Sequence, residues 1–502
     1  MGPAPAARLR AAVTAAVVAT AVLGVPSVAR GAAIAPTTAA PATASPTVAP
    51  ATGGAGVPAP PNLNRFDLAQ VGYEQSEVLL SGTARAFAPV TGTLTTDGEW
   101  KVAPTDTAPY TTRLVVYRPI KAKRFDGTVL VEWLNVSGGV DADPDWTQTH
   151  NELVRAGTVW VGVSAQAVGV NATKAADPAR YASLSHPGDS FSYDIFSQAG
   201  DAIRHDAPQI LGGLKPTTIL GAGESQSASR LVTYIDAVHP LAHAYDGYFV
   251  HSRSGGGLPL SQAPQPVVLA PSPTLIRDDL DVPVLTFQTE TDVSFGNAAY
   301  RQPDTKRRRL WEVAGSAHYD YYGLAIGPSD VGDGQGAVKN LAAMQAPASN
   351  ATGFSCSAPI NTGGTHWVLN AAVHALERWV VDGVAPPTEP LLQLASTSPV
   401  VLARDADGNA LGGVRSPQVD APIAALGGTV NRATAGSGFC FLFGTTVPFD
   451  AARLATLYPS HGAFVTAWNR ASRQAVARGW LLPPDAAELR KAATASTVGE
   501  NP

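Results

Sequence analysis

The chain has 502 residues, which is enough for two or three average domains or for one large domain with insertions. Its composition is that of a globular protein, with 45% hydrophobic and 15% charged residues. The formal net charge of −5 provides no basic surface, so we expect no nucleic-acid partner.

The N-terminal stretch has the pattern of an export signal. Arg8 and Arg10 precede an apolar run that ends near Val25, and small residues suited to a cleavage site follow. The run is shorter than the roughly 20 residues that a membrane span needs, with an uncleaved anchor as the alternative. We therefore predict a signal peptide over residues 1–33, a secreted or cell-surface location, and no transmembrane anchor after cleavage.

Residues 34–61 consist almost wholly of Ala, Pro, Thr, Gly and Val. Such a segment cannot bury a core, so it is predicted to be an extended, disordered linker. The folded domain is then expected over residues 62–490.

Short apolar runs alternate with helical periodicity along the next part of the chain. Residues 66–119 are expected to be mainly β, with extended stretches at 91–95 and 111–117. The later pattern predicts strands at 127–134, 158–163, 217–220, 247–250, 282–287 and 310–313, and helices at 146–155, 192–205 and 226–238. This alternation predicts an α/β fold whose mainly parallel sheet is covered by helices on both faces.

Two regions are less regular. The stretch 252–281 is rich in Pro and Gly and is expected to be an insertion above the sheet that forms one wall of a pocket. Helices expected at 368–380 and within 451–477 predict a C-terminal lid or lobe over about 327–490.

The sequence contains two cysteines, Cys356 and Cys440. In an exported protein a single pair most simply forms one disulfide, and two separate buried thiols are the alternative. We therefore predict a disulfide between Cys356 and Cys440.

The segment Gly223-Glu-Ser225-Gln-Ser227 lies directly between a predicted strand and a predicted helix. This arrangement is typical of a nucleophile elbow, a tight turn that exposes a serine above the sheet. Small residues two positions before and after the serine keep the turn free of clashes, and Ser227 here replaces the more usual glycine. A helix-capping serine is the alternative, because Gly and Ser are abundant. The pattern favours Ser225 as a nucleophile.

An acidic group and a histidine follow the candidate nucleophile. Asp292 lies where one predicted strand ends, and His318 follows another strand and a turn of small residues. Ser, then acid, then His is the chain order of α/β-hydrolase triads. We expect His318 to be the general base and Asp292 to orient it, with Glu290 as the alternative acid and His366 as the alternative base.

Backbone amides should stabilise the oxyanion of such a site. The amide of Gln226 follows the nucleophile directly, and a second donor is expected from the glycine-containing loop after the 127–134 strand, at Val136 or Ser137. Gln166 and the loop around His186, Asp189 and Tyr193 are further candidates for lining a pocket. No phosphate loop, dinucleotide fingerprint or zinc-type His/Cys motif is found, so neither cofactor nor metal is expected.

These residues resemble the secreted α/β-hydrolase-domain family common in actinobacteria. The resemblance rests on Gly223–Ser227, Gln288–Asp292 and Val313–His318, together with the stretch Val368–Trp379 followed by Gly383 and Pro386-Pro387. It extends from about Asn62 to the C-terminal region and implies the α/β-hydrolase fold and a Ser-His-Asp triad, but no particular substrate.

The expected activity is hydrolysis of a small-molecule or lipid-like carboxylic ester through an acyl-enzyme at Ser225. Peptidase, thioesterase or lactonase chemistry on the same triad is the first alternative. A catalytically silent cell-surface binding module is the second, although such a module has no need of all three triad residues.

Overall fold

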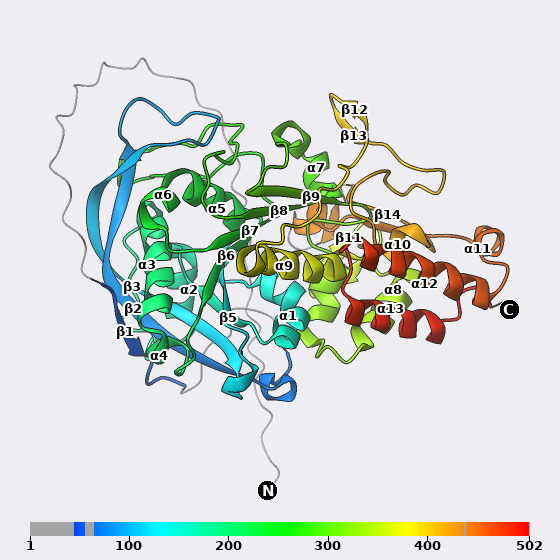
Figure 1. Ribbon diagram of the computed structural model, residues 1–502, viewed down its shortest axis with the longest axis horizontal. Helices are drawn as coiled ribbons and strands as arrows, with labels where there is room; N and C mark the ends of the chain where they lie inside the picture. Colours follow the sequence, from blue (N-terminus) through cyan, green and yellow to red (C-terminus); the bar gives the residue numbers. More distant parts are fainter. Residues whose placement is uncertain (1–44, 56–64, 430, 436–437, 501–502) are drawn as a thin grey trace, which may run out of the picture. The chain divides into compact units, whose positions relative to one another are not determined.

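A nine-stranded sheet organises the computed structural model, which describes residues 45–55, 65–429, 431–435 and 438–500. The strand order is β1-β2-β3-β5-β4-β6-β7-β8-β9 (Figure 1). The strands are β1 Thr47–Pro50, β2 Tyr73–Pro89, β3 Val102–Pro119, β4 Thr128–Trp133, β5 Val159–Val163, β6 Thr218–Glu224, β7 Gly247–His251, β8 Val284–Thr289 and β9 Arg308–Val313. Strands β4 to β9 pair in parallel, whereas β1, β2 and β3 add an antiparallel extension that joins the parallel part through β5.

The antiparallel extension differs from the sequence prediction in two places. Thr47–Pro50, inside the segment predicted to be a disordered linker, forms β1 on the edge of β2. The long β2 offers an unpaired row of backbone groups there, which favours pairing whatever the composition of the added segment. Residues 91–95, predicted to be extended, lie in the turn region where β2 reverses into β3, and Gly92 there has a φ of 67°. The predicted signal peptide over residues 1–33 lies outside the described residues.

Helices cover both faces of the parallel strands, as the sequence predicted. The helices next to the sheet are α1 Pro144–Ala156, α2 Ala167–Ala176, α3 Ser192–His205, α4 Ala207–Ile210, α5 Gln226–Ala237, α6 His239–Ala242, α7 Glu290–Ser294 and α9 Thr365–Asp382. Alternate residues of one strand face opposite sides, because side chains in a strand point up and down in turn. In β4, Val129 and Val131 pack in one core with α3 and α5, whereas Leu130 packs in the other with α1 and α9.

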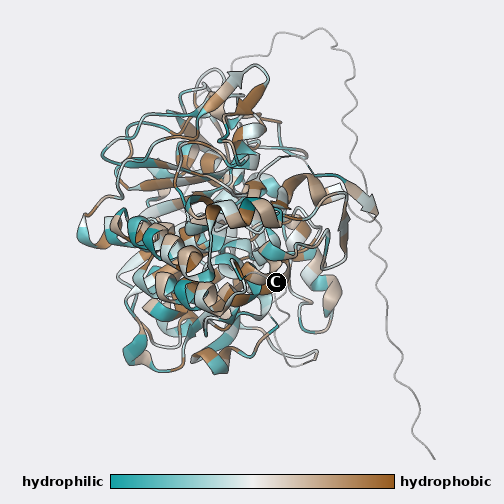
Figure 2. Cartoon of the chain, turned by 90° about the vertical axis from the view of Figure 1, so that its right-hand side faces the viewer, coloured by the Kyte–Doolittle hydropathy of each residue, from teal (hydrophilic) through white to brown (hydrophobic). Residues whose placement is uncertain are grey.

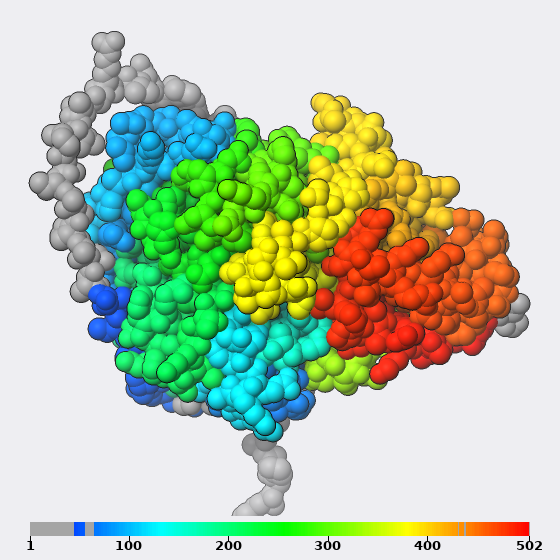
Figure 3. All heavy atoms as spheres, viewed as in Figure 1, coloured from blue at the N-terminus to red at the C-terminus, as the bar shows by residue number. Residues whose placement is uncertain are grey.

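Part of the predicted C-terminal lobe belongs to the main sheet domain. Helix α9, which lies inside the predicted lobe, packs on β6, β7 and β8 and on α1, so it belongs to the cover of the sheet. The remaining elements of this region are η6 Gly327–Ser329, α8 Gln335–Gln345, β10 Asn350–Ala351, β11 Phe354–Cys356, β12 Leu394–Thr397, β13 Val400–Leu402, α10 Pro417–Asp420, β14 Ala424–Gly427, β15 Ala433–Ala435, η7 Gly438–Leu442, β16 Thr445–Pro448, α11 Ala451–Leu457, α12 His461–Ala477 and α13 Pro483–Ala495. The space-filling view shows α9 (yellow) beside the last helices (red), and Asn370 of α9 donates a hydrogen bond to Asp485 of α13 at 3.1 Å (Figure 3).

The C-terminal helices are amphipathic. In α12 the buried side chains Phe464, Trp468, Ala471 and Ala475 recur every three to four residues and so share one face of the helix. Figure 2 shows hydrophobic and hydrophilic residues mixed along the helices that face the viewer. None of the helices in the described part of the chain has the length and apolarity that crossing a membrane requires.

The Pro- and Gly-rich segment 252–281 packs beside α3 and α5. Its Pro259 carbonyl accepts a hydrogen bond from Tyr193 at 2.8 Å, and its Leu275 amide donates to Thr96 in the β2–β3 connection at 2.9 Å. The segment therefore joins the face of the sheet that α3 and α5 cover to the antiparallel extension.

Candidate active site

Ser225 occupies the single-residue junction between β6 and α5. Its backbone has φ 59° and ψ −117°, a strained combination for a residue with a side chain, and its amide donates to the His251 carbonyl at 2.9 Å. A Cβ atom at Gly223 would come within 3.1 Å of the backbone of Ser227, a tight contact that a glycine avoids. Ser227 itself fits in the first turn of α5 with its side chain fully buried. The junction thus has the geometry of a nucleophile elbow.

His318 lies between the serine and an acid. Its Nε2 atom is 2.8 Å from the Ser225 hydroxyl oxygen, and its Nδ1 atom is 2.6 Å from Oδ1 of Asp292. The His318 amide also donates to the Thr291 hydroxyl at 3.2 Å. These contacts bring together the three residues that the sequence predicted to form a triad.

Asp292 is held from several sides in the first turn of α7. Its Oδ2 atom accepts hydrogen bonds from the hydroxyls of Ser252 at 2.8 Å and Thr289 at 2.7 Å, and from the Thr289 amide at 2.7 Å. Burial alone would raise the pKa of Asp292, but His318 and the Thr289 hydrogen bonds hold that pKa below its usual value. The carboxyl group therefore stays ionised beside the imidazole.

Glu290, the alternative acid, points elsewhere. Its carboxylate accepts from the amide of Gly315 at 2.6 Å and from the amide of Gly428 at 3.0 Å, and it forms an ion pair with Arg404 at 2.8 Å. The helix α7 begins at Glu290, and residues two positions apart on a helix do not share a face. Glu290 therefore does not face His318, and it ties α7 to the C-terminal region instead.

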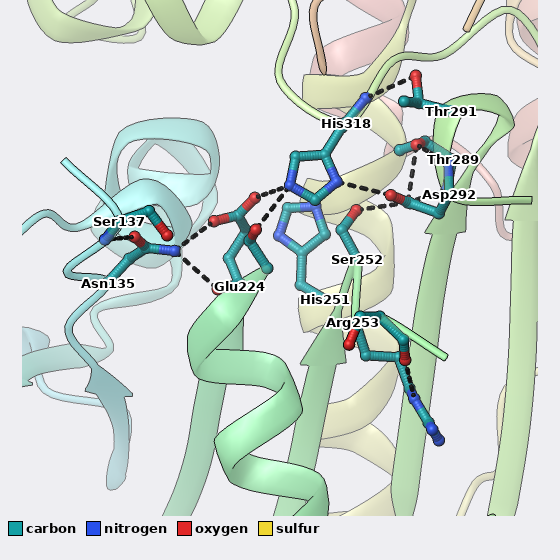
Figure 4. Close-up of polar contacts among 12 residues, drawn as sticks. Asn135, Ser137, Glu224, His251, Ser252, Arg253, Thr289, Thr291, Asp292 and His318 are labelled. Atoms are coloured by element: carbon teal, nitrogen blue, oxygen red, sulfur yellow. Dashed lines mark hydrogen bonds and ion pairs between the residues drawn. The ribbon is translucent and has the colours of Figure 1, made fainter. Parts of the chain in front are cut away.

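Glu224 is a further acid beside the histidine, one that the sequence analysis did not single out. Its Oε1 atom is 3.2 Å from Nε2 of His318, and its Oε2 atom accepts from the Asn135 side chain at 3.2 Å. Figure 4 shows the imidazole with Glu224 on one side and Asp292 on the other. The available signal was an acidic residue at the last position of a fully buried strand, immediately before the candidate nucleophile.

Glu224 and His318 shift each other's pKa. Burial raises the pKa of Glu224 to about 7, although His318 and His251 act in the opposite direction. Burial would lower the pKa of His318, but Asp292 and then Glu224 outweigh it and raise that pKa to about 9. An imidazole between two carboxylates thus retains its proton to a higher pH than a histidine in water.

The loop after β4 borders the serine. Asn135 donates from its side chain to the carbonyl of Glu224 at 3.1 Å, and its Oδ1 atom accepts from the amide of Ser137 at 2.8 Å. The Ser137 amide is therefore already engaged, which leaves the amides of Gln226 and Val136 as candidate oxyanion donors.

A cavity of about 220 Å³ opens beside the triad. One side carries polar groups from the β4 loop and the elbow, and the other side is apolar and largely aromatic. The lining residues are Asn135, Ser137, Gly138, Ala142, Pro144, Glu224, Ser225, His318, Tyr319, Leu324, Phe354, Phe439, Leu442 and Phe443. The predicted pocket wall from segment 252–281 is absent from this lining, because that segment packs against α3 and α5 instead.

The aromatic side of the cavity comes mainly from the C-terminal region, and Tyr319 and Leu324, which follow His318, complete it. Cys356 and Cys440 form the predicted disulfide, which joins β11 to η7. Both cysteines pack in a small apolar cluster with Phe354, Phe439 and Phe443. The disulfide therefore links the two chain segments that supply the aromatic wall.

Other sequence candidates lie away from the serine. His366 is buried at the start of α9, where its Nδ1 atom is 2.6 Å from the Gln148 carbonyl and its ring stacks on Tyr322 at 3.8 Å. Burial lowers the pKa of His366 to about 3. It cannot serve as the base for Ser225, because its hydrogen bonds and ring contacts are all made elsewhere.

The candidates for pocket lining form a buried polar network instead. Gln166 accepts from Trp133 at 3.1 Å and donates to Asp189 at 3.2 Å, and Arg230 pairs with Asp189 at 3.1 Å. His186 contacts the Ala165 carbonyl at 2.9 Å, while the hydroxyl of Tyr193 points to Pro259. None of Gln166, His186, Asp189 and Tyr193 lines the cavity beside Ser225, so that expectation is wrong.

The solved structures that match this chain have low sequence identity to it. The carboxylesterase Cest-2923 from Lactobacillus plantarum WCFS1 is 13% identical, with 37% of this chain and 68% of that chain covered and a TM-score of 0.24. An α/β serine hydrolase homologue from Coxiella burnetii is 11% identical, with coverage of 42% and 84% and a TM-score of 0.25. A thermostable esterase from Pseudomonas putida ECU1011 is 15% identical, with coverage of 45% and 66% and a TM-score of 0.24.

Comparison with curated proteins found no match. The model of one protein family, described as an alpha/beta hydrolase domain, matches residues 35–491 and so spans most of the chain. The strand order, the helices on both faces and this match agree on the fold. The chain belongs to the alpha/beta hydrolase domain family.

Proposed function

We propose that this hydrolase cleaves carboxylic esters through an acyl-enzyme formed on Ser225. The observation that carries the proposal is the continuous contact from Ser225 through His318 to Asp292, at 2.8 and 2.6 Å, on a strained strand-to-helix junction. A serine that only caps a helix has no need of a histidine and an acid in this arrangement.

In the proposed mechanism, His318 takes the hydroxyl proton as Ser225 attacks the ester carbonyl. Asp292 holds the ring and stabilises the imidazolium that forms. The amide of Gln226 and one amide of the β4 loop stabilise the oxyanion, since both elements border the serine. His318 then protonates the departing alcohol. In the second half of the reaction, His318 takes a proton from a water molecule that attacks the acyl-enzyme, and it returns that proton to Ser225 as the carboxylic acid leaves.

The cavity indicates the class of ester. Its far wall consists of Leu324, Leu442 and three phenylalanines, with no charged group among them. A wall of this kind stabilises an apolar acyl or alcohol group by removing its surface from water. We therefore propose small-molecule or lipid-like esters with one apolar side as substrates.

Other chemistries use the same residues. A peptidase, thioesterase or lactonase would need the same serine, base and oxyanion donors, and the ester is preferred only because it is common among proteins of this fold. A silent binding module is disfavoured because nothing in binding alone requires the strain at Ser225.

Export remains part of the proposal. The disulfide Cys356–Cys440 supports it, because structural disulfides persist mainly in oxidising compartments. The mass of the mature protein recovered from the culture medium tests it, and we expect removal of residues 1–33.

A fluorophosphonate probe tests the nucleophile in the folded mature protein. We expect stoichiometric labelling at Ser225, located by peptide mass spectrometry, and none in Ser225→Ala. Ser227→Ala is the matched control, because it removes a neighbouring buried hydroxyl that has no hydrogen-bond partner among the described residues. A folded sample that takes up no probe would refute the enzyme proposal and favour the binding module.

The leaving group is tested next with p-nitrophenyl esters of increasing chain length, set beside anilide, thioester and lactone analogues of equal size. We expect the esters to react fastest. If the anilide, thioester or lactone reacted faster, Ser225 would remain the proposed nucleophile and that class would replace the ester as the proposed substrate.

A further inference from the structure

Three side chains with metal-binding atoms converge at the end of α5 remote from Ser225. Helix α6 begins at His239, and His243 directly follows it with a left-handed backbone at φ 47°. Asp281 precedes β8 and reaches both rings: its Oδ1 atom is 2.8 Å from Nε2 of His239, and its Oδ2 atom is 3.2 Å from Nδ1 of His243. All three donor atoms lie within 4.8 Å of one another.

The donor set and its spacing suit a small divalent metal ion. Two imidazole nitrogens and one carboxylate oxygen are ordinary zinc ligands. Bonds of about 2.0–2.1 Å in a tetrahedral site place ligand atoms roughly 3.3 Å apart, so these groups need only small adjustments to share one ion. The sequence analysis found no such site because Asp281 is remote from the histidine pair along the chain.

The buried histidine is oriented by a partner behind it. The Nδ1 atom of His239 is 2.8 Å from the hydroxyl of Tyr248, which lies on β7 inside the core. A hydroxyl both donates and accepts, so it supports either ring tautomer. Without a metal, the Nε2–H group of His239 donates a hydrogen bond to Asp281. With a metal, the ring would carry its proton on Nδ1 and donate a hydrogen bond to the Tyr248 hydroxyl, which leaves Nε2 free to bind the ion. Metal-binding histidines usually have such a partner on their second nitrogen.

Exposure differs across the three ligands in a way that leaves room for further ligands. The side chain of His239 is 2% exposed, whereas those of His243 and Asp281 are 57% and 59% exposed. The ion would sit at the surface, held by one buried and two exposed ligands, with a remaining position open to water.

We propose that His239, His243 and Asp281 form a zinc site that joins α6 to the chain entering β8. The site is structural, because it lies at the opposite end of α5 from Ser225, and a helix of 12 residues is about 18 Å long. Zinc bound there would connect the elements that carry Ser225 and Asp292 at their distal ends and so stabilise the folded protein.

Zinc chloride titrated into the full mature protein, made without a histidine tag, tests the proposal by calorimetry and thermal unfolding. We expect one ion per chain and, at about 100 times the dissociation constant, a rise in Tm of about 3 °C. His243→Ala and Asp281→Asn change exposed side chains and should abolish both effects. Tyr248→Phe should weaken binding about 10- to 100-fold, as loss of an orienting partner does.

His205→Ala is the matched control, because His205 is an exposed histidine at the end of another helix. Its binding and its rise in Tm should equal those of the unchanged protein, with folding of every variant checked by circular dichroism. Absence of binding by the unchanged protein, or binding that survives both His243→Ala and Asp281→Asn, would overturn the proposal. Hydrolysis of the preferred ester should be unaffected by zinc, and inhibition alone would place the ion at a different site.

Discussion

The two sides of the cavity are built in opposite ways. The polar side comes from the carboxyl ends of parallel strands and the segments that follow them, and each reactive group there is held by hydrogen bonds to its neighbours, as Asp292 is by Ser252 and Thr289. The aromatic side comes from short elements of the C-terminal region, where Phe354 and Phe439 pack next to the disulfide. The difference suggests that the first side sets the chemistry and the second side selects the substrate.

The contrast has a physical basis. Hydrogen bonds to charged groups depend strongly on distance and angle, so they hold a proton-transfer geometry that apolar packing cannot specify. Apolar contact is non-directional and scales with area, so a wall of rings tolerates ligands of various shapes. If this division is correct, substitutions on the two sides should change different kinetic constants.

The largest expected effect separates the two carboxylates of α7. Asp292→Asn should lower kcat by about 10⁴-fold, because the ring of His318 would lose the partner that fixes its tautomer. Glu290→Gln should leave kcat nearly unchanged and lower the free energy of unfolding by about 2–4 kcal/mol, because it breaks the ion pair between a fully buried carboxylate and the partly exposed Arg404. Steady-state kinetics and urea unfolding of both variants distinguish the roles. The reverse pattern would make Glu290 the triad acid.

On the aromatic side, Phe439→Ala should lower kcat/KM for long-chain esters about 10- to 100-fold. The loss corresponds to roughly 1.5–3 kcal/mol of apolar contact with the substrate. For an acetyl ester, whose acyl group offers little apolar surface to the wall, kcat should stay within about twofold. A chain-length series measured on both proteins decides this. An equal loss for every chain length would contradict the division between the two sides.

Glu224→Gln sharpens the comparison through pH. His318 accepts a proton only when neutral, so its raised pKa of about 9 predicts that kcat/KM increases with pH up to about pH 9. Removing the adjacent negative charge makes the imidazolium less stable, which lowers the pKa of His318 and shifts the rise in kcat/KM to lower pH by roughly one unit.

A pH–rate profile of the Glu224→Gln variant measures this shift directly. A profile unchanged in position, with a lower plateau, would mean that Glu224 acts only by holding Asn135. Asn135→Ala is the companion variant, since it removes that contact and leaves the carboxylate in place.

The smallest kinetic effect is expected from the disulfide. Replacing Cys356 and Cys440 by serine should lower the free energy of unfolding by about 2–4 kcal/mol, because the bond closes a long loop of 84 residues. Labelling of Ser225 by fluorophosphonate should proceed at an unchanged rate, while KM for long-chain esters rises about threefold. Loss of labelling in a folded double variant would show that the wall also supports the triad.

Much of the fold was predictable from local pattern. The strands β4 to β9 and the helices α1, α3 and α5 were expected close to their observed bounds, because buried parallel strands are short apolar runs and their covering helices have a period of 3.6 residues. The edge strand β1 was missed, because its pairing depends on the free edge of β2 and not on its own composition.

The candidate site divides in the same way. Ser225 was visible in the sequence because an elbow requires a small residue, a serine and a helix start at fixed spacing, and His318 was visible because it follows a strand at a turn. The sequence did not settle the choice between Asp292 and Glu290. That choice depends on where α7 begins and on Arg404 and Gly428, which are remote along the chain.

The sequence by itself determined the features that arise from neighbours along the chain: the order of elements, the elbow and the presence of a single cysteine pair. Only the tertiary structure decided which acid faces the imidazole, that Glu224 lies beside it, and that Phe354 and Phe439 form the far wall. The physical reason is that backbone conformation is set by steric limits and hydrogen bonds a few residues apart. Burial, charge pairing and cavity shape instead depend on groups that meet only when distant segments pack.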